Sequence, residues 1–348
     1  MKKSHRGIWI VSFTLILTII ITLTVNHKAT NMVFRNLTAP VYHFDESQDD
    51  WDGGSTYLGV QYSDVSPNDY VNIYVPVSGE APPLYVLIHG GGFVSGVAES
   101  KQAQMIYRYF RDHGFACASV NYRLAQEAPF PGAVKDCKAA IRFLRAHADE
   151  YGYNADRIAV FGESAGGYLA VMCAVTNDDE FNDLPFIGQG ALGDVSAKVD
   201  VLVDYYGVKE WDLKKYLPDI ELPTLIYDIA NSWVGDLEME GFDDFVSYWL
   251  RKEITELTAE ELAVSDPYTY IEKNLPGNNN LSAWIIHGDC DMTVPYPQSD
   301  RLNKKLVDIL GPDRVTYRLI PNMGHASDPL YSEEILADIE GFLKEHLA

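Results

Sequence analysis

Short runs of Val, Ile, Leu and Ala alternate with helical segments along most of this 348-residue chain. The segments between the runs place apolar residues at three- and four-residue spacing, as in the stretch 132–151, which predicts helices with one apolar stripe. Such alternation predicts an α/β fold in which helices cover both faces of a mainly parallel sheet. The runs that read as strands are LYVLIHG, FACASVNY, RIAVFG, VDVLVDYYG, SAWIIHG and VTYRLIP, and LYVLIHG suits a strand buried on both faces.

Two further β-branched and aromatic runs, TYLGVQY and DYVNIYVPV, precede the alternating part. The turn-rich hexapeptide SDVSPN separates them, which predicts an antiparallel hairpin at an edge of the sheet. Hydrophobic residues make up 47% of the chain and charged residues 22%, so the chain can bury a sizeable core. We therefore expect one α/β domain over residues 55–348.

One stretch, residues 208–265, interrupts the alternation. It contains no Val- and Ile-rich strand but holds many acids and several aromatic residues. An insertion of this length between core elements is usually functional or forms a small subdomain. We interpret it as a helical cap whose aromatic residues mostly form the core of the cap, with one or two facing a pocket. These aromatic residues include Trp211, Tyr216, Trp233, Phe242, Phe245, Tyr248 and Trp249.

The first 26 residues have the pattern of a membrane segment. Lys2, Lys3 and Arg6 precede residues 7–25, a run of 19 residues without a charge, which matches the roughly 20 residues that span a hydrocarbon core. A cleaved signal peptide has a shorter apolar region and a small-residue cleavage site, and no clear site of that kind follows. We expect a single-pass anchor in the cell membrane with the rest of the chain outside. A cleaved secretion signal and a buried helix of the domain are the alternatives.

Charge is distributed unevenly along the chain. The first 28 residues hold four bases and no acid, which leaves 23 bases against 50 acids in residues 29–348, a balance of −27. A surface this acidic repels phosphate backbones and argues against nucleic-acid binding. Residues 27–54 have little periodicity and end in an acidic, glycine-containing stretch, which predicts a tether between the membrane segment and the domain.

The four cysteines follow neither a disulfide framework nor a CxxC metal pattern. We interpret Cys117, Cys137, Cys173 and Cys290 as small buried residues, with one disulfide as the alternative. The sequence also has no His-x-x-x-His motif, and its HGGG segment precedes no G-K-[ST]. We therefore expect neither a metal ion nor a cofactor.

The sequence GESAG, residues 162–166, lies between the apolar run RIAVF and the apolar helical segment AGGYLAVMCAVT. A serine at such a strand-to-helix turn is held in a strained, exposed position, and the flanking glycines let the two backbones pass each other. The helix behind Ser164 adds a partial positive charge and free backbone N–H groups, notably that of Ala165. Ser164 is therefore the candidate nucleophile.

HGGGF, residues 89–93, directly follows the strand-like run LYVLI. Consecutive glycines allow backbone N–H groups to turn into one concave cluster, which is what a tetrahedral oxyanion requires. We expect the N–H groups of Gly91, Gly92 and Ala165 to form an oxyanion hole. A tight turn without a chemical role is the alternative.

A serine nucleophile needs a base that is itself oriented by a carboxylate. Six of the nine histidines lie beside the membrane segment, in the tether or at the outer ends of helices. His89 and His287 belong to HG turns at strand ends, where we expect the ring to brace a loop. His325, in the loop PNMGHAS after the run VTYRLI, is the candidate general base.

The acid is expected on a strand-end loop that precedes His325 in the chain. The segment HGDCDMTVP, residues 287–295, follows the run SAWII and offers two carboxylates, Asp289 and Asp291. The position of this segment in the chain is compatible with either residue as the acid.

These segments resemble the hormone-sensitive-lipase-like esterases of the α/β-hydrolase superfamily, and specifically the BD-FAE-type esterases. The resemblance covers about residues 55–348 and rests on HGGGF, NYRLAQEAPFPGAVKD, GESAGG, HGDCDMTVP and GHAS. The second segment departs from the family's D-Y-R-L-A-P-E-x-P-F-P-A at Asn121 and Gln126. The residue spacing in this family favours Asp291 over Asp289, which gives the α/β-hydrolase chain order of serine, acid and histidine.

The resemblance implies hydrolysis of carboxylic esters through an acyl-enzyme on Ser164. His325 would act first as base and then as acid, and Asp291 would hold the imidazole tautomer. The resemblance further suggests short acyl groups such as acetyl, with carbohydrate as one alcohol portion, although the long cap departs from the compact members. An aminopeptidase or amidase with the same triad and a catalytically silent binding module are the alternatives.

Overall fold

The computed structural model describes residues 51–187, 194–211, 247–252, 256–276 and 280–347. The membrane segment expected at 1–26, most of the tether at 27–54 and most of the cap at 208–265 lie outside the described residues. The same holds for four of the cap aromatics, namely Tyr216, Trp233, Phe242 and Phe245. Within the described ranges, no helix is both long enough and apolar enough to span a bilayer.

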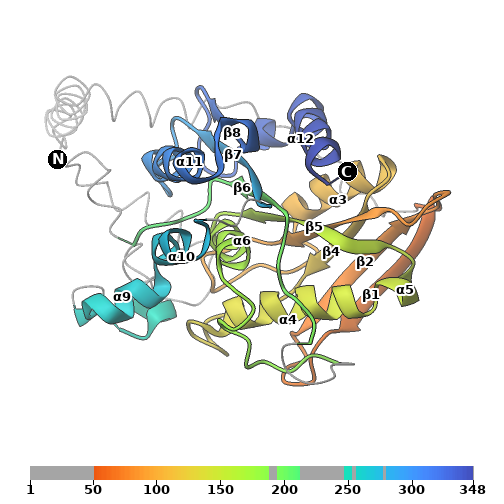
Figure 1. The fold of residues 1–348 in the computed structure, drawn as a ribbon, viewed down its shortest axis with the longest axis horizontal. Helices are drawn as coiled ribbons and strands as arrows, with labels where there is room; N and C mark the ends of the chain where they lie inside the picture. Colours follow the sequence, from red (N-terminus) through yellow and green to blue (C-terminus); the bar gives the residue numbers. More distant parts are fainter. Residues whose placement is uncertain (1–50, 188–193, 212–246, 253–255, 277–279, 348) are drawn as a thin grey trace, which may run out of the picture.

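Eight strands form one sheet in the order β1-β2-β4-β3-β5-β6-β7-β8 (Figure 1). β1 pairs with β2, and β2 with β4, in antiparallel fashion, whereas all other neighbours are parallel. The predicted edge hairpin and the mainly parallel sheet are thus confirmed. The strands are β1 (Gly54–Gln61), β2 (Tyr70–Pro76), β3 (Pro83–Ile88), β4 (Ala116–Val120), β5 (Asn154–Glu163), β6 (Val201–Tyr205), β7 (Ser282–Gly288) and β8 (Val315–Ile320).

The helices follow the strands in chain order, as the alternating pattern predicts. The stretch 132–151, expected as one helix, forms two, because the backbone leaves the helical conformation at His147. At the break, Nδ1 of the His147 ring lies 2.9 Å from the carbonyl oxygen of Phe143. The described helices are α3 (Lys101–Asp112), α4 (Gly132–Ala146), α5 (Ala148–Tyr151), α6 (Ala165–Val175), α9 (Ala259–Ser265), α10 (Pro267–Asn274), α11 (Pro297–Leu310) and α12 (Glu333–His346), with the short 3-10 helices η2 (Pro312–Arg314) and η3 (Asp328–Tyr331).

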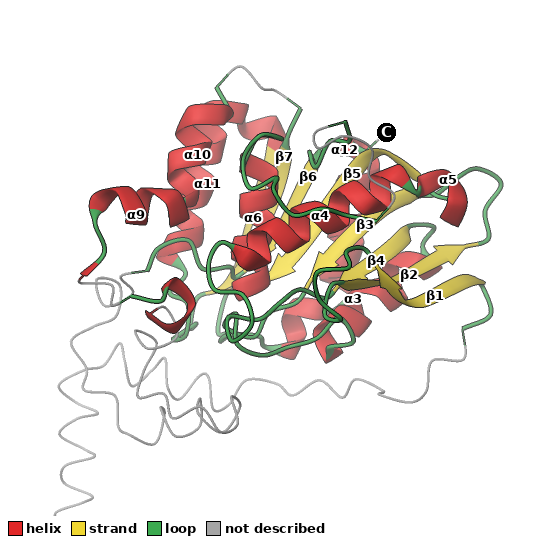
Figure 2. Ribbon diagram, turned by 90° about the horizontal axis from the view of Figure 1, so that it is seen from below, coloured by secondary structure: helices red, strands yellow, loops and turns green. Residues whose placement is uncertain are grey.

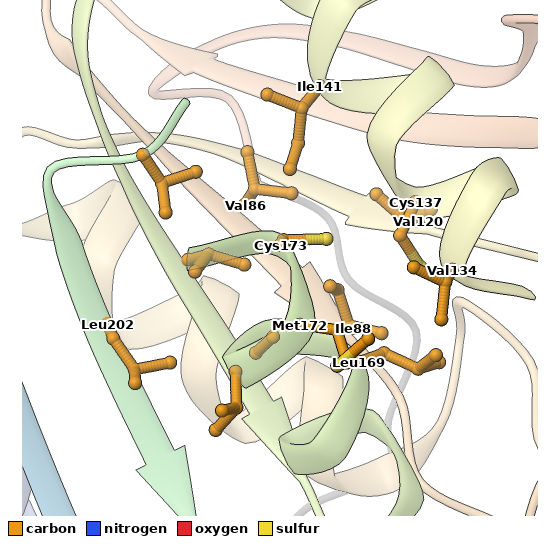
Figure 3. Packing of buried hydrophobic residues seen from close by; sticks show 14 of the residues in the cluster. Val86, Ile88, Val120, Val134, Cys137, Ile141, Leu169, Met172, Cys173 and Leu202 are labelled. Atoms are coloured by element: carbon orange, nitrogen blue, oxygen red, sulfur yellow. The ribbon is translucent and has the colours of Figure 1, made fainter. Parts of the chain in front are cut away.

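The sheet separates two hydrophobic cores (Figure 2). Side chains of β3 alternate between them: Val86 and Ile88 face the core that includes α4, α6, α10 and α11, whereas Tyr85 faces the core that includes α3 and α12. Figure 3 shows the first core, where α4 and α6 pack on the strands through residues such as Cys137 and Leu169. This two-sided burial explains why the central strands are apolar throughout.

All four cysteines are free and buried. Cys137 and Cys173 lie in the first core between α4, α6 and the sheet (Figure 3). Their interpretation as small buried residues is confirmed, and the alternative of a disulfide is wrong.

The end of the tether packs on the domain. β1 begins at Gly54, one residue before the expected domain boundary. The carbonyl of Gly53 accepts a hydrogen bond from the Val77 N–H at 2.8 Å. The guanidinium of Arg111 on α3 lies 4.5 Å from the ring centroid of Trp51. The last four tether residues are therefore part of the folded structure.

Candidate active site

Each segment singled out in the sequence lies just beyond the carboxyl end of a parallel strand. HGGGF follows β3 and Ser164 follows β5, and these two strands are neighbours. Asp291 follows β7 and His325 follows β8, which are also neighbours. Because the carboxyl ends of parallel strands meet at one edge of a sheet, the fold brings all four segments to the same edge.

Ser164 occupies the sharp turn between β5 and α6. Its backbone has φ 51° and ψ −117°, a strained conformation for a residue with a side chain. The turn is tight because α6 approaches the neighbouring strand closely: a Cβ on Gly166 would lie 2.2 Å from the carbonyl oxygen of Ile88. This geometry holds the Ser164 hydroxyl at the amino end of α6, where the helix dipole favours negative charge.

Ser164, His325 and Asp291 form a continuous hydrogen-bonded row. Nε2 of His325 lies 2.9 Å from Oγ of Ser164, and Nδ1 lies 2.7 Å from Oδ2 of Asp291. Since a carboxylate only accepts, Nδ1 carries the proton and Nε2 is free to accept that of the serine hydroxyl. The structure therefore brings together the three residues that the sequence predicted, which we call the candidate triad.

Asp291 is held as an anion by several donors. Its Oδ1 accepts hydrogen bonds from the backbone N–H groups of Thr293 and Val294 at 2.9 and 2.8 Å. Its Oδ2 is shared by His325 and by Nε2 of His287, the latter at 3.1 Å. Burial alone would raise the pKa of Asp291, but the charge of His325 and the hydrogen bonds from His287 and His325 lower it well below its usual value.

Asp289, the alternative acid, points to another partner. Its Oδ1 accepts a hydrogen bond from the backbone N–H of Asn322 at 2.6 Å. This bond ties the loop after β7 to the loop that carries His325. The structure thus brings Asp291 to the imidazole and uses Asp289 to connect the two loops.

The glycine loop passes directly beside Ser164. A Cβ on Gly90 would lie 3.3 Å from Cβ of Ser164. Gly91 and Gly92 have φ values of 114° and 60°, which favour glycine and turn successive peptide groups. Within the described part of the chain, the N–H groups of Gly91 and Gly92 donate to no protein acceptor. Ala165 begins α6, so its N–H has no acceptor in a preceding helical turn.

His89 braces the glycine loop, as expected. Its Nδ1 lies 2.7 Å from the carbonyl oxygen of Gly90, and its ring stacks on that of Tyr122 at a centroid distance of 4.2 Å. The Tyr122 hydroxyl in turn donates to the His89 carbonyl at 2.9 Å. Burial lowers the pKa of His89 to about 4, so the ring is neutral near neutral pH.

A buried acid next to the nucleophile was not singled out in the sequence. Oε2 of Glu163 accepts hydrogen bonds from the hydroxyls of Tyr206 and Tyr331 at 2.7 and 2.6 Å. The ring of Tyr206 also meets the ring of His325 edge-on at 4.8 Å. Burial raises the pKa of Glu163 although both tyrosine hydrogen bonds lower it. The position of Glu163 at the end of the apolar strand RIAVFG is a local signal for a buried acid, although not for its two tyrosine partners.

Trp249 connects the cap segment to the glycine loop. Its ring stacks on Phe93 of HGGGF, with centroids 4.0 Å apart and planes 9° apart. Its carbonyl oxygen accepts a hydrogen bond from the Phe130 N–H at 2.9 Å. Trp211 lies against it at 5.0 Å, and both are buried in the main core. The aromatic residues of 208–265 are expected mostly in a separate cap core, but Trp211 and Trp249 belong to the core of the domain, because they pack on Phe93 and Tyr168 of the body.

The arrangement has the parts that acyl transfer requires. It contains an oxygen nucleophile, a base within hydrogen-bond reach, a carboxylate that orients the base, and turned N–H groups beside the nucleophile.

Several esterases are similar to this chain in sequence. Esterase LipC of Mycobacterium tuberculosis is 26% identical over 250 residues, which cover 71% of this chain and 54% of the relative. The probable carboxylic ester hydrolase LipM of the same organism is 25% identical over 278 residues, covering 78% and 56%. The chain spans about half the length of these curated relatives.

Solved structures share the fold. A truncated form of a carbohydrate esterase from gut microbiota has a TM-score of 0.66 at 24% identity, covering 85% of this chain and 97% of that one. The esterase Est2 of Thermogutta terrifontis, with propionate bound, has a TM-score of 0.59 at 20% identity, covering 84% and 94%.

The family model described as BD-FAE matches residues 71–306, which is more than half of the chain. This range includes the glycine loop, the nucleophile turn and Asp291, whereas His325 lies beyond it. The chain belongs to the BD-FAE family of hormone-sensitive-lipase-like esterases.

Proposed function

We propose that this protein hydrolyses carboxylic esters through an acyl-enzyme on Ser164. The observation that carries the proposal is the hydrogen-bonded row from Ser164 through His325 to Asp291. His325 takes the hydroxyl proton as Oγ attacks the ester carbonyl, and Asp291 stabilises the resulting imidazolium. The imidazolium gives its proton to the departing alcohol. Water then attacks the acyl-enzyme with His325 again as base, which releases the acid and restores Ser164.

The glycine loop would stabilise the tetrahedral intermediates of both steps. The carbonyl oxygen becomes negatively charged when Oγ or water attacks, and preorganised N–H groups lower the energy of that charge. Gly91 and Gly92 follow Gly90, which lies beside Ser164, and Ala165 follows the nucleophile directly, so we propose that their N–H groups do this. Loss of one oxyanion donor typically costs about 10²- to 10³-fold in kcat.

We propose short acyl groups such as acetyl as substrates, with acetylated carbohydrate as one class. Ester hydrolysis is supported by the names of the relatives, which are esterases or carboxylic ester hydrolases. The short acyl group rests on the resemblance to BD-FAE-type esterases. The carbohydrate class is supported by one solved structure with this fold, a carbohydrate esterase from gut microbiota.

The test is a comparison of substrates with Ser164→Ala as the blank. Hydrolysis of p-nitrophenyl acetate, butyrate and octanoate and of acetylated sugars is compared with that of an aminoacyl anilide. We expect kcat/KM to be highest for acetate or butyrate and lowest for the anilide. Faster turnover of the anilide would favour the amidase alternative, and undiminished hydrolysis by Ser164→Ala would exclude the triad. A protein that hydrolyses none of these substrates would fit a binding module.

We also propose that residues 7–25 anchor the protein in the cell membrane with the α/β domain outside, a secreted form being the alternative. The uncharged run and the basic residues before it support this orientation. N-terminal sequencing of the mature protein tests it. We expect the sequence to begin before residue 7 and the protein to resist extraction with alkaline carbonate. A mature chain that begins after residue 25 would show a cleaved signal.

A further inference from the structure

The candidate triad continues into the interior of the protein through His287. The His287 side chain is fully buried at the end of β7. Its Nε2 lies 3.1 Å from Oδ2 of Asp291 and 2.8 Å from the carbonyl oxygen of Val294. Its Nδ1 lies 2.7 Å from Oγ of Ser299 at the start of α11. Both ring nitrogens of this histidine are thus engaged, and one of them contacts the acid of the candidate triad.

The direction of each hydrogen bond follows from the chemistry of the partners. The Val294 carbonyl and the Asp291 carboxylate only accept, so Nε2 of His287 carries a proton. The ammonium of Lys209 only donates, and its Nζ lies 2.9 Å from Oγ of Ser299. Ser299 therefore accepts from Lys209 and has its own proton available for Nδ1 of His287. This pattern fixes one imidazole tautomer, whose single Nε2 proton is shared between the Asp291 carboxylate and the Val294 carbonyl.

The series of hydrogen bonds from His287 through Ser299 ends at an ion pair that is completely buried. Nζ of Lys209 lies 2.5 Å from Oδ2 of Asp204 on β6, and both side chains have no exposed surface. Burial lowers the pKa of Lys209, and the adjacent Asp204 opposes that change. A buried ion pair is a poor source of stability because its desolvation offsets much of the Coulomb attraction. The ion pair is better explained by a role in fixing the positions of Ser299 and His287, which lead to the candidate triad.

Hydrogen bonds also hold the backbone next to these side chains. Oε1 of Gln298 accepts hydrogen bonds from the backbone N–H groups of Lys209 and Glu210 at 2.7 and 3.1 Å. Oδ1 of Asp204 accepts one from the Gly207 N–H at 3.2 Å. These bonds join the turn after β6 to the start of α11, next to the loop that carries Asp291.

We propose that His287, Ser299 and Lys209 are positioning residues that hold Asp291, and through it the general base His325, in the geometry for proton transfer. The proposal rests on the function proposed above. Removal of the His287 donor would leave Oδ2 of Asp291 held by His325 alone, while the N–H groups of Thr293 and Val294 still hold Oδ1. The carboxylate could then tilt about Oδ1, and the imidazole of His325 would move with it. Misplacement of a catalytic group by about 1 Å can lower the rate about 10²-fold.

The test compares His287→Leu with His287→Gln in the full-length protein. The two replacements are similar in size, but only glutamine offers an N–H group near the position of Nε2. We expect His287→Leu to lower kcat for p-nitrophenyl acetate about 10- to 100-fold, with KM within about twofold of the wild type. We expect His287→Gln to recover at least about tenfold of that loss. Thermal unfolding of both variants controls for folding.

Further variants test the residues beyond His287, namely Ser299 and the Lys209–Asp204 ion pair. Lys209→Met alone would leave Asp204 buried without its partner, so the double variant Lys209→Met/Asp204→Asn removes both charges. We expect it to lower kcat while KM is kept. The conservative Ser299→Thr should keep more activity than Ser299→Ala, since threonine retains the hydroxyl.

The outcomes separate this inference from the proposed function. A wild-type protein without Ser164-dependent hydrolysis overturns the proposed function and this inference with it. An active wild type whose His287→Leu variant keeps its kcat overturns the inference alone. Equal losses of activity in His287→Leu and His287→Gln, matched by equal losses of thermal stability, would show a packing role and would also overturn it.

Discussion

At the scale of single residues, the two acids of the loop after β7 have distinct partners. Asp291 accepts from His325, His287 and two backbone N–H groups, whereas Asp289 accepts from the backbone of Asn322. The side chains are two positions apart in the sequence, yet only one can orient the imidazole. This difference makes them a matched pair for mutation.

We predict that Asp291→Asn lowers kcat by roughly 10⁴-fold, because an amide favours the wrong imidazole tautomer and cannot stabilise the imidazolium. Asp289→Asn should keep kcat within about tenfold of the wild type, since Asn retains an oxygen that can accept from the Asn322 N–H. Steady-state kinetics with p-nitrophenyl acetate checks both. A larger loss in Asp289→Asn than in Asp291→Asn would contradict the assignment.

The sequence predicts Ser164 and His325 as site residues because each follows a recognisable strand. Family resemblance favours Asp291 over Asp289, and the geometry supplies the physical reason, since only Asp291 contacts the His325 imidazole. Glu163 was missed because its partners, Tyr206 and Tyr331, lie 43 and 168 residues away in the chain. No local pattern reports contacts of that separation, so such a cluster becomes visible only in the folded structure.

At the scale of elements, the close packing of α6 on the sheet determines where Ser164 lies. A Cβ on Gly166 would lie 2.2 Å from the Ile88 carbonyl oxygen and 2.4 Å from that of His89, and these backbone atoms cannot move aside cheaply. Gly341, on α12, provides a contrast because a Cβ there would meet nothing within 4 Å. The same substitution therefore has opposite consequences in the two helices.

We predict that Gly166→Ala destabilises the protein by about 1–3 kcal/mol and lowers kcat, because α6 must shift away from β3 and carry Ser164 with it. Gly341→Ala should stabilise by about 0.5–1 kcal/mol through helix propensity and leave kcat unchanged. Urea unfolding and ester hydrolysis measure both effects. Wild-type kcat in Gly166→Ala would show that the close approach of α6 does not position the nucleophile.

The elements themselves could be predicted largely from residue patterns. Buried strands and amphipathic helices follow from periodicity, and the turn-rich segment between β1 and β2 predicted the edge hairpin. The break between α4 and α5 could not be predicted, because the apolar three- and four-residue spacing continues through His147 to Ala148. The packing of Trp249 on Phe93 is likewise a long-range contact without a local signal.

At the scale of the whole molecule, the fold also buries acids that do not belong to the candidate triad. Asp69 is fully buried and lies 3.7 Å from the guanidinium of Arg123, which also binds Asp136. Burial, followed by the nearby charge of Asp136, raises the pKa of Asp69 to about 7. The folded protein thus holds a proton on Asp69 at pH values where the unfolded chain, with an ordinary pKa near 3.9, has lost it.

This raised pKa makes stability depend on pH. The contribution of Asp69 is fully present below about pH 4 and is lost as the pH rises toward about 7. We predict that Asp69→Asn, which does not titrate, becomes more stable relative to the wild type between about pH 5 and about pH 8, by on the order of 2 kcal/mol. Urea unfolding of both proteins at the two pH values measures the change. A difference in unfolding free energy between the variant and the wild type that is the same at both pH values would contradict the prediction.

The central claim is that Ser164 is the nucleophile of an esterase, and covalent labelling tests it most directly. The full-length protein is treated with a fluorophosphonate, and the modified peptide is identified by mass spectrometry. We predict one adduct per chain on Ser164, lost in Ser164→Ala and formed much more slowly in His325→Ala, because the base must take the hydroxyl proton. An active esterase that carries the adduct on another residue, or that is still labelled in Ser164→Ala, would contradict the account.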